Sequence, residues 1–74
     1  MDTSNPDVWG YMTLAMLKKD KRVNSAFQSM KESIRLGIKN HDLLLDIGKA
    51  FAEINENETA KKALEYAMVQ RANA

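Results

Sequence analysis

The only histidine of this 74-residue chain, His41, precedes Asp42 directly and Asp46 by little more than one helical turn. An imidazole and two carboxylates are groups that bind divalent metal ions. One imidazole with carboxylates from the same short segment is nevertheless a poor set, because zinc sites use several histidine or cysteine ligands. We therefore expect His41 to be a residue at the start of a helix, and we expect no metal and no cofactor.

Catalytic chemistry has little support elsewhere in the sequence. The chain contains no cysteine, and its histidine is not paired with a nucleophile. The three glycines, Gly10, Gly37 and Gly48, are scattered and form no phosphate-binding loop. Nucleophilic and acid–base catalysis need such groups side by side. We therefore expect that the protein is not an enzyme, has no catalytic residues and takes no small-molecule substrate.

A run of four basic residues interrupted by Asp20 covers residues 18–22. Such a run is compatible with a nuclear localisation signal or a phosphate-binding patch. It is equally compatible with a solvated turn whose lysines face the negative end of a helix dipole. The chain has 11 basic and 10 acidic residues, a formal net charge of +1, whereas nucleic-acid-binding domains normally carry a strong basic excess. We favour the solvated turn and expect no nucleic-acid partner.

Neither a membrane span nor a signal peptide is indicated. No apolar segment approaches the roughly 20 residues that cross a bilayer. The opening residues 1–6 are polar and include an acidic residue, unlike the basic and then apolar start of a signal peptide. We expect no membrane partner and an intracellular location, in the cytoplasm or the cytoskeleton.

The positions of apolar and capping residues predict an all-α chain. Pro6 suits the first turn of a helix, and Asn40 is a favourable residue to cap another. Gly37 is a natural left-handed helix end, and Asn55 with Glu58 resembles a capping box. Short connections make neighbouring helices antiparallel. Four helices are predicted, over residues 6–19, 23–36, 41–54 and 58–71.

Two stretches of the chain repeat each other at a spacing of 34 residues. Ala26, Met30, Ser33 and Ile34 correspond in this way to Ala60, Leu64, Ala67 and Met68. A period of 34 residues is that of helix–turn–helix tetratricopeptide repeats. The small residues Gly48 and Ala60 would allow the helices of one hairpin to approach closely, with large apolar residues filling the space around them.

The chain resembles the tetratricopeptide family. The second hairpin carries the large, small and aromatic residues of that pattern at Leu44, Ile47, Gly48, Phe51, Ala60, Leu64 and Ala67. The first hairpin is a looser match, at Trp9, Met12, Thr13, Met16, Ala26, Met30 and Ser33, and needs one extra residue near Asp20. The resemblance implies a single domain, residues 1–74, in which the antiparallel hairpins 5–37 and 40–71 stack as a short right-handed superhelix. The run Val8–Tyr11 with Leu14 is also similar to the C-terminal repeats of a large cilia- and flagella-associated tetratricopeptide protein of the axoneme.

The resemblance implies a non-catalytic scaffold that binds a protein or peptide along the first helix of each hairpin. Leu14 stands where chaperone-docking members carry the Asn of their carboxylate clamp, so that clamp is missing. We expect mainly apolar contact with a few charges. A solvated helix face is the alternative for Lys49 and Glu53. The predicted contact residues are Tyr11, Leu14, Leu17, Lys49 and Glu53.

The first helix carries apolar residues on nearly every side, from Val8 to Leu17. A helix of this kind must be covered on every side. The cover is an earlier repeat of a larger parent protein, a partner, or a second copy of this chain; the alternative is a closed bundle. Two other functions remain open, a free-standing self-associating adaptor or regulator and a helix–turn–helix nucleic-acid binder.

Overall fold

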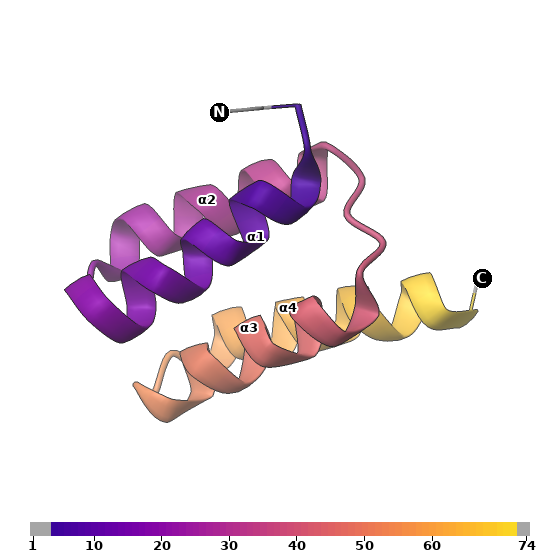
Figure 1. Ribbon diagram of the computed structural model, residues 1–74. Coiled ribbons are helices and arrows are strands. Elements are labelled where there is room, and N and C mark those ends of the chain that lie inside the picture. Colours follow the sequence, from indigo (N-terminus) through magenta and orange to yellow (C-terminus); the bar gives the residue numbers. More distant parts are fainter. Residues whose placement is uncertain (1–3, 73–74) are drawn as a thin grey trace. The chain divides into compact units, whose positions relative to one another are not determined.

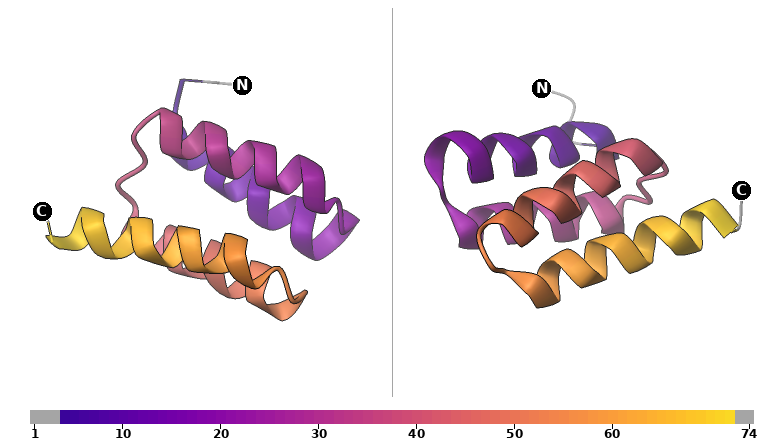
Figure 2. Two further views of the ribbon diagram at one scale, coloured as in Figure 1. Left: turned by 180° about the vertical axis from the view of Figure 1, so that it is seen from behind. Right: turned by 90° about the horizontal axis from the view of Figure 1, so that it is seen from below.

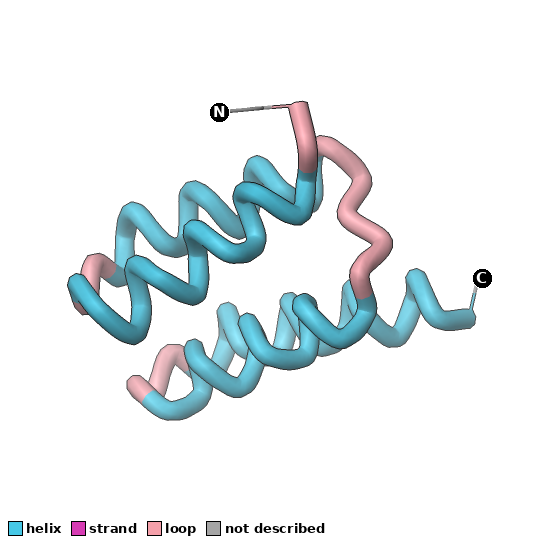
Figure 3. The backbone as a smooth tube through the Cα atoms, in the orientation of Figure 1, coloured by secondary structure: helices cyan, strands magenta, loops and turns pink. Residues whose placement is uncertain are grey.

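The structure is a computed structural model that describes residues 4–72, and within this range it is helical without any strand (Figures 1 and 3). The predicted all-α class is therefore confirmed. The ends of the predicted domain, residues 1–3 and 73–74, lie outside the described residues. The elements are α1 (Pro6–Ala15), the π-helix η1 (Met16–Asp20), α2 (Val23–Arg35), α3 (His41–Glu53) and α4 (Asn57–Ala72).

The chain divides into two compact units, Met1–Ile38 and Lys39–Ala74. In the first hairpin, α1 and η1 pack against α2, and in the second hairpin α3 packs against α4. Figures 1 and 2 show from several sides that the two helices of each hairpin run antiparallel and side by side.

Asparagine side chains cap the N-termini of two helices, α1 and α3. The Asn5 side chain accepts a hydrogen bond of 2.9 Å from the backbone N–H of Asp7, and Pro6 follows in the first turn. Asn40 accepts one of 3.1 Å from the N–H of Leu43. Each bond satisfies an amide that has no partner within its helix. The predicted starts of the first and third helices are confirmed.

The second and third helices end in left-handed residues. Gly37 has φ 84° and follows α2, where the N–H of Ile38 donates to the carbonyl of Ser33 at 3.1 Å. Asn55 has φ 66° and ends α3 in the same way. The predicted capping box of Asn55 with Glu58 is therefore wrong, because Asn55 terminates the preceding helix and α4 begins only at Asn57.

The first helix continues as far as predicted, but its last five residues form a π-helix. The backbone N–H groups of Lys21 and Arg22 both donate to the carbonyl of Met16. Lys21 takes a left-handed conformation, with φ 52°, to close this turn. A π-turn holds one residue more than an α-turn. The chain therefore widens over residues 16–20 before it enters α2.

The core contains two hydroxyl side chains, Thr13 and Ser33, that are fully buried. Each donates to a carbonyl of its own helix, Thr13 to Trp9 at 2.9 Å and Ser33 to Met30 at 2.8 Å. These bonds satisfy the hydroxyls without any partner from another helix. The buried apolar residues are Leu17, Ala26, Met30, Ile38, Leu43, Leu44, Ile47, Ala50, Phe51, Ala60, Ala63 and Ala67.

We expect Ser33→Ala to change the free energy of unfolding by less than about 1 kcal/mol, in either direction. The substitution removes a buried hydroxyl, and the Met30 carbonyl keeps its place in the helix ladder. Ser33→Val, which adds volume at the same buried site, is the contrasting variant and should cost about 1–3 kcal/mol. Urea denaturation followed by circular dichroism measures both. A loss above about 2 kcal/mol in Ser33→Ala would show that the hydroxyl itself stabilises the hairpin.

Candidate protein-contact surface

The outer side of α1 exposes an aromatic residue. Tyr11 is 59% exposed, Ala15 is exposed as well, and Leu14 is half-buried between them. The opposite side of this helix is closed by the buried residues Gly10 and Thr13. Tyrosine is among the residues that contribute most to protein interfaces. The first hairpin therefore presents an aromatic and partly apolar surface at Tyr11 and Leu14, two of the predicted contact residues.

Leu17 does not belong to this surface. Its side chain is only 4% exposed. It lies seven residues after Gly10 and four after Thr13, so it continues the buried row of α1 into η1. The prediction of Leu17 as an accessible contact residue is therefore corrected: it is a core residue.

The remaining two predicted contact residues lie in the second hairpin. Lys49 and Glu53 are both exposed on α3, one helical turn apart. The structure shows no ion pair between these two described residues, while Lys61 and Glu65 of α4 lie 4.0 Å apart. Both charges are thus open to solvent.

An exposed apolar pair on α4 was not predicted. Met68, the counterpart of the half-buried Ile34 in the 34-residue repeat, is 66% exposed, and Val69 beside it is 54% exposed. The reason is the length of α4. His41, the first residue of the antiparallel α3, lies level with Ala67, so the residues after Ala67 extend beyond the start of α3. The periodicity of the sequence does not reveal where the opposing helix begins.

His41 has a structural contact. Its Nδ1–H donates to the carbonyl of Ala67 at 3.1 Å and ties the start of α3 to α4. The predicted position at the start of a helix is confirmed. Asp42 and Asp46 are exposed on the same helix. Within the described residues, no group of three or more His, Asp, Glu or Cys residues is arranged to hold a metal ion.

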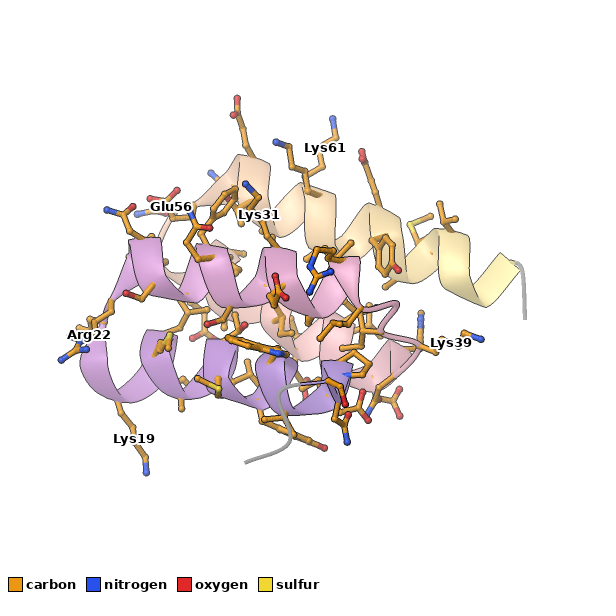
Figure 4. The ribbon with its side chains drawn as sticks, turned by 90° about the horizontal axis from the view of Figure 1, so that it is seen from above. Lys19, Arg22, Lys31, Lys39, Glu56 and Lys61 are labelled. Carbon is orange, nitrogen blue, oxygen red and sulfur yellow. The ribbon has the colours of Figure 1, made fainter. Side chains whose placement is uncertain are left out.

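The basic run forms the turn between α1 and α2. Lys18 and Lys19 are exposed on η1, and Lys21 and Arg22 are exposed in the connection to α2. Figure 4 shows Lys19 and Arg22 pointing outward at this end of the first hairpin. No ion pair involves these four side chains among the residues that the structure describes.

The first hairpin contains an ion pair between two residues of α2. The Arg35 guanidinium donates to the carboxylate of Glu32, and its Nε–Oε1 distance is 3.0 Å. This hydrogen bond lowers the pKa of the Glu32 carboxyl and raises the pKa of Arg35. The Arg35 side chain is exposed and that of Glu32 is partly exposed, so the pair is a surface interaction.

Comparisons of the chain with protein-family models, with curated proteins and with solved structures give no match. Within residues 4–72, none of the helices has the length and apolar character that crossing a bilayer requires.

Proposed function

We propose that this chain is a non-catalytic protein-interaction module of the tetratricopeptide class. In this proposal the two hairpins stack as a short right-handed superhelix, and the chain is part of a larger assembly scaffold. The likeness of Val8–Tyr11 and Leu14 to axonemal repeats favours a scaffold of the cilium or flagellum. The observation that carries the binding function is the exposed Tyr11 on a helix that is closed on its opposite side.

The packing of the second hairpin supports the tetratricopeptide class. A Cβ atom placed on Gly48 would lie 2.7 Å from Cδ2 of Leu64, which is closer than real Cβ contacts. The helices therefore approach each other at a site where only glycine fits without a shift. Ala60 is buried on the opposing helix, as the close approach requires. A close approach of helices at small residues is what the resemblance to the tetratricopeptide family implies for this hairpin, and it supports the proposal.

The surface chemistry supports a protein or peptide ligand. Tyr11 offers an apolar ring with a hydroxyl group, and Leu14 adds partly exposed apolar area on the same side of α1. Burying such area on a partner is the main source of affinity at interfaces. Lys49 and Glu53 of α3 are exposed charges that would select among partners rather than supply most of the affinity.

Selection from a displayed library of random peptides tests this function with the chain itself as bait. We expect enriched peptides whose affinity falls about tenfold or more in the variant Tyr11→Ser with Leu14→Asp, because truncating an interface tyrosine costs about 2 kcal/mol. Val69→Ser is the matched control, since it also removes exposed apolar area but lies in the second hairpin. Fluorescence anisotropy measures the affinities, and circular dichroism verifies that each variant is folded. Failure to enrich any peptide, or equal binding by the Tyr11 variant, would exclude the proposed surface.

A further inference from the structure

The four cations at the turn of the first hairpin are held on a defined backbone. Lys21 and Arg22 donate their N–H groups to a single carbonyl, that of Met16, and Lys21 closes the turn in a left-handed conformation. Lys18 and Lys19 stand on the last turn of η1. Cations fixed close together raise the local potential and attract an anionic partner.

These cations continue the exposed side of α1. Tyr11 and Ala15 are exposed one turn apart on α1, and Lys18 and Lys19 are exposed on η1, which follows α1 directly. At 1.5 Å per residue, Lys18 lies roughly 10 Å along the axis from Tyr11. The side of α1 that carries the exposed aromatic ring therefore ends in a cluster of positive charge.

We propose that this side of α1 docks an acidic segment of a partner protein. In the bound state, apolar side chains of the segment cover Tyr11 and Leu14, and its carboxylates lie against Lys18, Lys19 and Arg22. A guanidinium binds a carboxylate with two parallel hydrogen bonds, which gives Arg22 a directional contact. The inference rests on the proposed function and adds to it the chemical class of the partner. The docking side consists of Tyr11, Leu14, Ala15, Lys18 and Lys19, with Arg22 in the turn that follows η1.

The arrangement of charges favours a protein segment over a nucleic acid or a membrane. A single-stranded nucleic acid needs cations that follow its backbone and several aromatic rings for stacking. Here the cations gather at one end, and α1 carries an acidic residue, Asp7, in its first turn. A helix that lies on a membrane needs several large apolar residues on one face and basic residues along the other. On the first hairpin, Tyr11 is the one large hydrophobic residue that is exposed among those described.

The peptides selected with the unaltered chain provide the test. We expect them to combine apolar residues with Asp or Glu, and we expect their affinity to fall about tenfold or more in Lys18→Glu with Lys19→Glu and Arg22→Glu. Lys61→Glu with Lys62→Glu on α4 is the matched control, because it reverses two exposed lysines in the second hairpin. Added salt should weaken the acidic peptides more than it weakens neutral ones. The same anisotropy assay measures a labelled single-stranded uridine-rich RNA and phosphatidylserine vesicles.

Selected peptides without acidic residues, bound equally by the charge-reversed variant, would overturn the inference and leave the proposed function standing. Tighter binding of the RNA or the vesicles than of any peptide, lost on charge reversal, would assign the cations to phosphate groups and overturn the inference as well. A selection that enriches no peptide would instead count against the proposed function itself. Acidic peptides that lose affinity both on charge reversal and in the Tyr11 variant would establish both proposals.

Discussion

Replacing Phe51 by alanine is expected to lower the free energy of unfolding by about 3–5 kcal/mol. Phe51 is 0% exposed and is the largest of the fully buried side chains among the described residues. At about 0.05–0.15 kcal/mol per residue, a chain of this length has only about 4–11 kcal/mol in total. Phe51→Ala therefore removes a large part of the stability of the second hairpin. Urea denaturation followed by circular dichroism measures the loss.

Two further substitutions on α3 show whether the effect is due to packing. Phe51→Leu keeps most of the apolar volume and should lose clearly less than Phe51→Ala. Glu53→Ala, at an exposed position of the same helix, should stay within about 0.5 kcal/mol of the unaltered chain. A loss below about 1 kcal/mol for Phe51→Ala would contradict the packed core described for this hairpin.

The features that the sequence predicted correctly depend on neighbouring residues. Asn5, Asn40 and Gly37 act on the backbone within a few positions, so their roles follow from residue type alone. The apolar stripe of the third helix is also local, because its spacing determines which residues share a side. Leu44, Ile47 and Phe51 are accordingly buried as expected.

The features that were missed depend on the opposing helix or on a change of helical period. Met68 continues the apolar stripe of α4, but α3 does not extend far enough to cover it. Asn55 suits both the cap at the start of a helix and the left-handed residue that ends one. The position of the turn between α3 and α4 decides that it ends α3. Leu17 shares the buried side of the first helix with Gly10 and Thr13, and which side is covered depends on the helices packed against it. The π-turn of η1 is a change of helical period that has no simple sequence signature.

The candidate contact surface could be predicted only in part. The exposed position of Tyr11 followed from a helix with more apolar residues than its neighbours can cover, and Leu14 is half-buried beside it. The basic cluster was visible as a run of residues, but its continuity with Tyr11 depends on the three-dimensional spacing of η1. The identity of the partner could not be predicted, because it depends on the sequence of a second molecule.

Gly48→Ala is expected to destabilise the second hairpin, although alanine is the better helix former. The new Cβ would lie 2.7 Å from Cδ2 and 2.8 Å from Cγ of Leu64, so one of the two helices or the leucine must shift. Overpacking of this kind costs about 1–3 kcal/mol, against a gain of about 1 kcal/mol from helix propensity. We expect a net loss of up to about 2 kcal/mol in urea denaturation.

The same substitution should reverse its sign once Leu64 is shortened. In a Leu64→Ala background the clash is gone, the Ala60 carbonyl at 3.5 Å is an ordinary contact, and only the helix propensity gain remains. Gly48→Ala should then stabilise the hairpin by up to about 1 kcal/mol, and the coupling between the two positions should equal the removed overpacking cost of about 1–3 kcal/mol. Additive effects would show that Leu64 moves aside freely and that close helix packing does not require glycine at this position. A change of sign would show that the approach of α3 to α4 needs a small residue at this position, which is the contact that supports the proposed tetratricopeptide class.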